Sequence, residues 1–154
     1  MKVVLSLGSN LGESEATLRA AIEELTRVVQ VDAVSSFVYT QPQGVVDQPE
    51  FVNCVVLCET ELAPMELLAA VQRIELAAGR TREVRWGPRT LDIDLIMCDD
   101  LTSDDPDLTL PHPRAHERAF VLVPWCEIDP DAVLPGYGRI DALIPNVASQ
   151  GVRR

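Results

Sequence analysis

Hydrophobic residues recur along the chain with the two-residue period of strands in some segments and with the helical period in others. Short runs rich in apolar and β-branched residues predict four strands, at residues 2–7, 31–40, 51–59 and 91–98. Helical spacing predicts two helices, one with an apolar stripe from Leu18 to Val29 and one over residues 64–78 that ends at Gly79. The predicted order is therefore strand, helix, strand, strand, helix, strand.

This βαββαβ order is that of the ferredoxin-like fold. It predicts an α+β protein, an α/β sandwich in which helices pack on an antiparallel sheet, with a C-terminal extension after residue 98. In that extension we expect an acidic loop at residues 99–107, a short helix near residues 120–127 and a frayed end at residues 149–154. A chain of 154 residues can bury one sizeable core, so we expect residues 1–154 to form a single domain.

Composition and charge narrow the possible partners. With 47% hydrophobic and 24% charged residues, the chain has the composition of an ordinary globular protein. Its net charge of -11 disfavours nucleic acids and anionic membranes, which are bound chiefly through Lys and Arg. No apolar run approaches the roughly 20 residues of a membrane span, and residues 1–8 turn polar too early for a signal peptide. We expect a cytoplasmic monomer that binds small molecules.

The four cysteines lie inside apolar runs, without the close Cys and His pairs of a zinc site. They are Cys54, Cys58, Cys98 and Cys126. Free cysteine is among the most buried residue types. We interpret all four as small core residues of a protein from a reducing compartment.

Arginines gather in one stretch of this acidic chain. Of 13 basic residues, five lie between Arg73 and Arg89, directly before the last predicted strand. Planar guanidinium groups bind small, highly charged anions through paired hydrogen bonds. The stretch favours a phosphate-bearing ligand, and a solvated charged loop is the alternative.

Two carboxylates interrupt the apolar strand that follows. Asp92 and Asp94 are two residues apart, so both side chains lie on one face of the strand. Mg²⁺ is usually held by one or two carboxylates together with substrate phosphates. The pattern indicates either a magnesium site for phosphoryl or diphosphoryl transfer, or an exposed pair neutralised by Arg85 or Arg89.

Asn53 interrupts another strand, on the same face as Phe51. Its amide offers donors and an acceptor that suit the amide edge of a heterocycle, and Phe51 could stack on the ring. An edge-strand Asn bonded to the backbone is an equally common arrangement. Trp86 could cover a flat ring or cap its loop. His112 lies between two prolines, where a lone His is usually structural, and neither His112 nor His116 indicates a site by itself. Residues 41–49 form a loop longer than a hairpin needs, which is typical of functional loops.

Together these residues resemble the 6-hydroxymethyl-7,8-dihydropterin pyrophosphokinase family. The most specific likeness is RWGPRTLDIDLI at residues 85–96, which follows the family's hallmark residue for residue. Shorter matches are LGSN at 7–10, DQPEFVN at 47–53 and LPH at 110–112, so the likeness covers most of residues 1–128. The chain departs from the family pattern at Gln41, Gln43, Glu83 and Pro113.

The resemblance implies an enzyme of folate biosynthesis that transfers diphosphate from ATP to 6-hydroxymethyl-7,8-dihydropterin, giving AMP and (7,8-dihydropterin-6-yl)methyl diphosphate. Asp92 and Asp94 would ligate two Mg²⁺ ions, with Arg80 and Arg89 as further catalytic residues. The implied ATP-binding residues are Gln72, Glu75, Arg80, Arg82, Trp86, Arg89, Ile93, His112 and Arg118. The implied pterin-binding residues are Thr40, Gln41, Gln43, Gly44, Phe51, Asn53, Trp86, Asp92 and Phe120, with the two phenylalanines on either side of the ring.

Functions of other classes also occur on this fold. An RNA-binding sheet would expose aromatic residues on a basic surface, whereas this chain is 5% aromatic and acidic. A regulatory domain that binds a small molecule is a second alternative. A different phosphotransferase with the same metal site is the strongest alternative, and the residues of the implied pterin slot argue against it.

Overall fold

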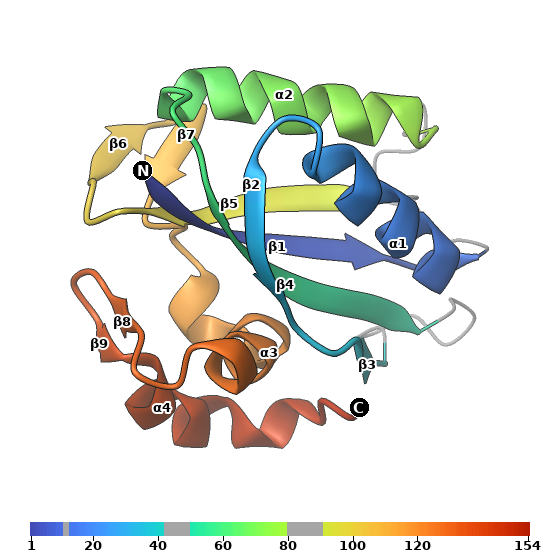
Figure 1. Ribbon diagram of the computed structural model, residues 1–154. Helices are drawn as coiled ribbons and strands as arrows, with labels where there is room; N and C mark the ends of the chain where they lie inside the picture. The colour runs from blue at the N-terminus through green and yellow to red at the C-terminus, as the bar shows by residue number, and fades with distance from the viewer. Residues whose placement is uncertain (11–12, 42–49, 80–90) are drawn as a thin grey trace.

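A five-stranded antiparallel sheet forms the centre of the computed structural model, which describes residues 1–10, 13–41, 50–79 and 91–154 (Figure 1). The strand order is β2-β4-β1-β5, and β3 also pairs with β4. The strands are β1 (Lys2–Ser9), β2 (Gln30–Val34), β3 (Val38–Thr40), β4 (Phe51–Glu59) and β5 (Asp92–Cys98). The predicted α+β class and antiparallel ferredoxin-like sheet are confirmed.

Two helices, α1 (Ser14–Leu25) and α2 (Pro64–Ala77), cover one face of this sheet (Figure 1). On α1 the residues that face the sheet, Leu18 and Leu25, are fully buried against alternate residues of β1 such as Leu5 and Leu7. Helix α2 begins with Pro64 in the first turn, where its missing N–H costs nothing. This helical face contains the larger hydrophobic core.

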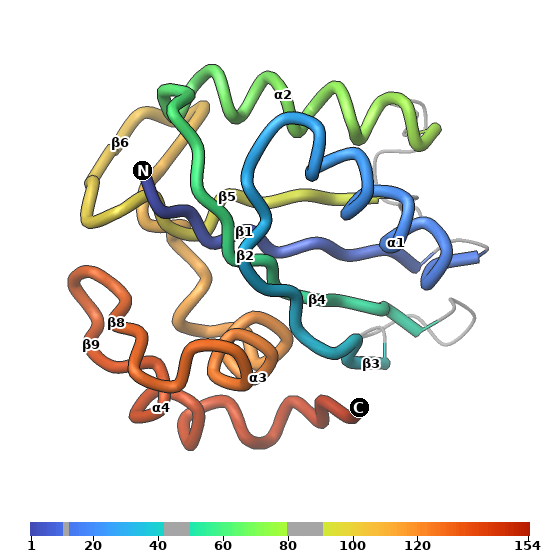
Figure 2. The backbone as a smooth tube through the Cα atoms, in the orientation of Figure 1, coloured from blue at the N-terminus to red at the C-terminus, as the bar shows by residue number. Residues whose placement is uncertain are grey.

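The opposite face of the sheet is covered at one end only. Helix α3 (Ala119–Ile128) packs there, and Val121, Leu122 and Trp125 form a second core with Val55 of β4 and Ile96 of β5. Around α3 lie the hairpin β8 (Val133–Leu134) and β9 (Gly138–Arg139), helix α4 (Ile140–Leu143) and a 3₁₀ helix (Ile144–Gln150). The tube in Figure 2 shows these last segments running beneath α3 towards β3.

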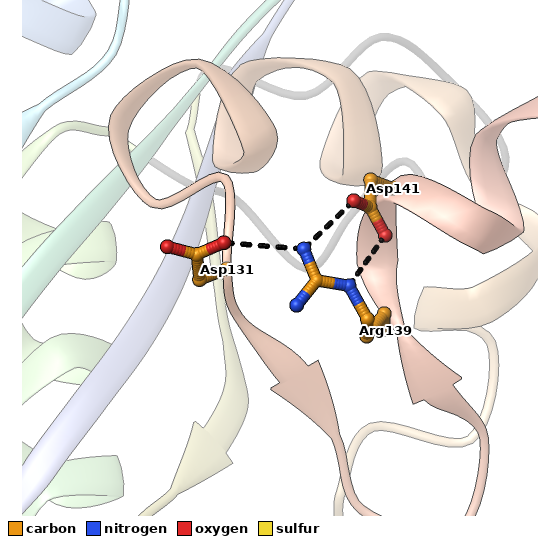
Figure 3. Close-up of polar contacts among 3 residues, drawn as sticks. All are labelled: Asp131, Arg139 and Asp141. Carbon is orange, nitrogen blue, oxygen red and sulfur yellow. Dashed lines mark hydrogen bonds and ion pairs between the residues drawn. The ribbon is translucent and has the colours of Figure 1, made fainter.

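The hairpin is joined to α4 by ion pairs on the surface (Figure 3). The Arg139 guanidinium donates to Asp131 Oδ1 at 3.1 Å and to both carboxylate oxygens of Asp141, at 3.1 and 2.9 Å. The hydrogen bonds that Arg139 donates, together with its charge, lower the pKa of Asp141 below its ordinary value. The remaining small elements connect β5 to α3, and they are β6 (Ser103–Asp105), β7 (Leu108–Leu110) and a 3₁₀ turn (Ala115–Glu117).

The single strand predicted over residues 31–40 is wrong, since the structure divides it into β2 and β3. Ser35 lies between them: its backbone N–H donates to Val55 O, and its hydroxyl accepts a hydrogen bond from Val55 N, both at 2.9 Å. A side-chain oxygen thus takes the place of a backbone carbonyl in the ladder, as Ser often does. The strand breaks there and resumes in pairing with the start of β4.

The expectation of a frayed end at residues 149–154 is also wrong. Arg153 forms an isolated bridge with Tyr39 of β3, with backbone hydrogen bonds of 2.7 and 3.1 Å. The outer edge of β3 offers unpaired backbone groups, and these groups order the segment. By contrast, the short helix predicted near residues 120–127 is present as α3.

The cysteines fit their interpretation as core residues. Cys54, Cys58 and Cys98 are buried free thiols, and Cys126 is half-buried. Burial raises the pKa of Cys54 and of Cys58 to about 12, so both are protonated at neutral pH. Within the described ranges, no helix has the length and apolar character needed to cross a membrane.

Replacing Leu67 by Ala should lower the free energy of unfolding by about 2–5 kcal/mol, because Leu67 is fully buried between α2 and the sheet and its truncation leaves a cavity. Leu76 lies on the same helix but is 57% exposed, so Leu76→Ala should change stability by less than about 0.5 kcal/mol. Urea unfolding of the two variants measures the difference. Equal losses would contradict the assignment of the buried face of α2.

Candidate active site

The register of the sheet brings polar residues from three strands to one face. Gly8 of β1 pairs with Asn53 of β4 on one side and with Asp92 of β5 on the other. Ser6, two residues earlier, pairs with Asp94. Directly paired residues point to the same side of an antiparallel sheet. These side chains therefore share the face on which α3 packs, at the end that α3 leaves open.

A pocket of about 480 Å³ lies between this end of the sheet and the start of α3. Six of the residues implied for pterin binding line it, namely Thr40, Gln41, Phe51, Asn53, Asp92 and Phe120. Phe51 comes from the sheet and Phe120 from α3, so aromatic rings stand on two different walls. We call this space the first pocket.

A second pocket, of about 330 Å³, adjoins it on the α2 side. Its lining includes four of the residues implied for ATP binding, Gln72, Glu75, Ile93 and Arg118. Asp92, Asp94 and Arg118 line both pockets. The two carboxylates therefore stand where the two pockets meet.

Arg118 connects the features of this junction. Its Nη1 lies 3.7 Å from Asp94 Oδ2, and its guanidinium carbon lies 5.5 Å from the centre of the Phe120 ring. Both members of the ion pair are partly exposed to solvent, so the pair itself contributes little to stability. A guanidinium held this way can bind an incoming phosphate with paired hydrogen bonds.

Glu75 connects helix α2 to the start of β5 through a hydrogen bond. Its side chain is 4% exposed, and Oε2 accepts a hydrogen bond from the backbone N–H of Ile93 at 3.0 Å. Because Ile93 lies between Asp92 and Asp94, this bond holds the backbone that carries both carboxylates. A direct contact of Glu75 with ATP stays a prediction.

Asn53 lines the first pocket, and its side-chain oxygen is buried without a donor among the described residues. The residue is 6% exposed, and its Nδ2 donates to Leu7 O at 3.4 Å. Oδ1 accepts no hydrogen bond from any part of the chain that the structure describes. A buried acceptor without a donor is costly, so such an atom at a pocket wall is suited to a ligand N–H.

Gly8 makes room for this amide. A Cβ atom on residue 8 would lie 2.4 Å from Asn53 Nδ2, far inside van der Waals contact. The sequence did not predict that Gly8 or Ser6 lines a site, although Gly8 belongs to the LGSN motif and both residues interrupt an apolar strand at a period of two. Arg114, Glu117 and Gln150 also line the first pocket, and the sequence did not predict this, because they lie in or beside short 3₁₀ helices of the extension that show no extended periodic pattern.

Several predicted site residues are not placed at these pockets. Gln43, Gly44, Arg80, Arg82, Trp86 and Arg89 lie outside the described residues. His112 lines neither pocket: its backbone N–H donates to Ile96 O at 2.8 Å, and its Nδ1 accepts from Arg114 N at 3.2 Å. Burial lowers the pKa of His112, and the negative charge of Asp94 partly offsets that effect.

The carboxylates suit a magnesium ion. Asp92 and Asp94 supply hard oxygen donors on one face, and both are partly exposed where the pockets meet. Among the described residues, no cluster of three or more His, Cys, Asp or Glu side chains could hold a metal by itself. Two carboxylates are nevertheless sufficient for Mg²⁺ when substrate phosphates supply further ligands.

The fold and the two pockets define a class of protein, a ferredoxin-like α+β protein with paired carboxylates where two ligand-sized pockets meet. Residues 4–130 match the family model described as 7,8-dihydro-6-hydroxymethylpterin-pyrophosphokinase (HPPK). The chain belongs to this family, and the resemblance noted from its motifs is confirmed.

Two relatives illustrate the similarity, each named 2-amino-4-hydroxy-6-hydroxymethyldihydropteridine pyrophosphokinase. The protein from Pseudomonas aeruginosa is 41% identical over 155 residues, which cover 99% of this chain and 96% of the relative. The protein from Bacillus subtilis is 47% identical over 126 residues, which cover 80% of this chain and 75% of the relative.

Solved structures show the same fold at low sequence identity. Wild-type HPPK-DHPS from Plasmodium falciparum superposes with a TM-score of 0.74 at 14% identity, over 96% of this chain and 41% of that one. The same protein with pterin and p-hydroxybenzoate gives a TM-score of 0.75 at 14% identity, over 96% and 42%. This chain therefore spans less than half the length of those longer chains, and the likeness concerns the fold.

Replacing Gly8 by Ala should destabilise the protein by about 1–3 kcal/mol, because the new Cβ must displace the Asn53 amide. In an Asn53→Ala background the same change should be neutral or slightly stabilising, since Ala is intrinsically better than Gly within a strand. Urea unfolding of the wild type, both single variants and the double variant measures this coupling. Equal losses of stability from Gly8→Ala in the two backgrounds would show that a Cβ atom at residue 8 does not clash with the Asn53 side chain.

Proposed function

We propose that this chain transfers the terminal diphosphate of ATP to the hydroxymethyl group of 6-hydroxymethyl-7,8-dihydropterin and releases AMP. One observation carries the proposal: the pocket lined by residues expected to bind pterin and the pocket lined by residues expected to bind ATP meet at Asp92, Asp94 and Arg118. Diphosphate transfer requires the two substrates to meet where charge is neutralised. The family to which the chain belongs agrees with this activity.

The first pocket would hold the pterin. Phe51 and Phe120 would stack on the two faces of the ring, an arrangement that fits their positions on the sheet and on α3. Asn53 Oδ1, which lacks a donor among the described residues, would accept a hydrogen bond from an N–H group on the amide edge of the ring. Thr40, Gln41 and Asp92 line the same pocket and would complete the slot.

The second pocket would hold part of the ATP molecule. Gln72, Glu75 and Ile93 line it, and Arg118 stands at its boundary with the first pocket. Arg118 would bind a phosphate oxygen in place of its 3.7 Å contact with Asp94. Contributions of Arg80, Arg82, Trp86, Arg89 and His112 to ATP binding, and of Gln43, Gly44 and Trp86 to pterin binding, stay predictions.

Asp92 and Asp94 would hold Mg²⁺, and two ions are expected from the family resemblance. When bound together with ATP, magnesium neutralises phosphate charge and orders the diphosphate for transfer. The hydrogen bond from Ile93 N to Glu75 would keep the two carboxylates in place while substrates enter.

In the reaction, the hydroxymethyl oxygen of the pterin attacks the β-phosphorus of ATP. The bond from that phosphorus to the oxygen shared with the α-phosphorus breaks, and AMP leaves with that oxygen. The hydroxyl proton leaves the pterin as the new bond forms and passes to solvent water. Arg118 would stabilise negative charge at the junction, and Arg80 and Arg89 are further candidates for that role.

The two pockets draw residues from position 6 to position 150, which supports our proposal that residues 1–154 work as a single catalytic domain. The monomeric state and the cytoplasmic location stay predictions.

To test the function, the purified protein is incubated with ATP, Mg²⁺ and 6-hydroxymethyl-7,8-dihydropterin, and the nucleotide products are separated. We expect AMP to form in step with pterin diphosphate. Asp94→Asn should lower kcat/KM by roughly a hundredfold or more, because a charged group at the reacting phosphates is lost. Asp104→Asn is the matched control, since Asp104 is an exposed residue of β6.

Formation of ADP in that assay would identify a different phosphotransferase. A wild-type protein that makes no product would contradict catalysis altogether. A loss in Asp104→Asn equal to that in Asp94→Asn would show that the effect is not specific to the pocket.

A further inference from the structure

Gln150, at the end of the last 3₁₀ helix, is bonded to the start of α3. Its Oε1 accepts a hydrogen bond from Ala119 N at 2.9 Å, and its Nε2 donates to Glu117 O at 2.7 Å. The amide thus binds the backbone on both sides of Arg118. Because Arg118, Phe120 and Gln150 itself all line the first pocket, these two bonds hold the helical wall of that pocket.

Arg153, three residues later, is bonded to the opposite wall. Its backbone pairs with Tyr39 on the outer edge of β3 through hydrogen bonds of 2.7 and 3.1 Å. Its guanidinium lies 2.5 Å from Glu50 Oε1 and 5.0 Å from the centre of the Tyr39 ring. Tyr39 directly precedes Thr40 and Glu50 directly precedes Phe51, and Thr40 and Phe51 are register partners that both line the first pocket.

One short segment therefore contacts both walls of the pocket. Three residues of extended chain span at most roughly 10 Å, so the two points of attachment cannot move far apart. Gly151, with φ of 68°, lies between them and lets the chain turn from the 3₁₀ helix into the pairing with β3. Figure 1 shows the end of the chain beside β3, after the segment has passed α3.

We propose that residues 150–153 act as a spacer that sets the distance between the Phe51 wall and the Phe120 wall of the pterin slot, with Gln150 and Arg153 as positioning residues. The inference rests on the proposed function, because it assumes that a pterin ring fills the first pocket. A flat ring stacked between two aromatic side chains needs one defined separation, and a wider slot weakens contact on one face.

Gln150 is a positioning residue rather than a binding residue because its oxygen and its nitrogen are both bonded to backbone groups of residues 117–119. The ion pair between Arg153 and Glu50 is partly exposed and is weak by itself. Its effect would come from acting together with the backbone bridge and with the stacking of Arg153 on Tyr39.

Steady-state kinetics of Arg153→Ala, of Gln150→Leu and of a chain lacking residues 151–154 test the spacer. We expect KM for the pterin to rise roughly threefold to tenfold in the point variants and further in the shortened chain. KM for ATP should stay within about twofold of the wild type in Arg153→Ala, whose contacts lie on the sheet wall, whereas Gln150→Leu also frees the backbone beside Arg118 and should raise KM for ATP as well. Arg153→Lys should recover part of the loss, since it keeps a charge near Glu50. Arg154→Ala is the matched control, because Arg154 pairs with Glu127 at 3.5 Å and lines neither pocket.

Hydrogen exchange of the same proteins supplies a readout that does not depend on turnover. The Tyr39 amide should exchange faster when residues 151–154 are absent, and the Ala119 amide faster in Gln150→Leu, because each loses its acceptor. An active wild type whose variants keep the wild-type KM for the pterin overturns the spacer and leaves the proposed function intact. An inactive wild type overturns both the spacer and the proposed function. Unchanged hydrogen exchange at the Tyr39 and Ala119 amides shows that residues 150–153 do not hold the walls of the first pocket.

Discussion

The pairing of β1 with β4 on one side and β5 on the other is the constraint on which the site depends. It places Gly8 between Asn53 and Asp92, three residues that are far apart in the sequence. A register slip of one residue would turn these side chains to the other face of the sheet. The buried apolar residues of the same strands, such as Leu5 and Leu7 beneath α1 and α2, prevent that slip, so the hydrophobic core also positions the polar site.

Unequal covering of the two sheet faces then creates the pockets. Helices α1 and α2 bury one face, while α3 buries only the end of the other face that carries Val55 and Ile96. The uncovered end holds the buried Asn53 oxygen, which has no donor among the described residues and is costly to leave in that state. The carboxylates of Asp92 and Asp94 line the same pocket. A ligand that supplies the missing hydrogen-bond donor removes this local cost. In the free protein, the stability of the two hydrophobic cores offsets it.

The residues after β5 complete the site from the other side. Arg118 and Phe120, at the start of α3, face the carboxylates and the sheet across the first pocket. Hydrogen bonds from Gln150 hold the start of that helix, and Arg153 reaches the strand on the far side. The extension is therefore part of the pocket wall as well as a cover for the second core.

The sequence by itself determined the features that depend on local periodicity. The strand and helix order, the shared face of Asp92 and Asp94 and the shared face of Asn53 and Phe51 all follow from spacings of a few residues. Only the tertiary structure determined that the strand breaks at Ser35, that Arg118 contacts Asp94 and that the last residues are ordered. Those features need partners such as Arg153 and Glu50, which are 103 positions apart, and no local pattern specifies which distant group a side chain will meet.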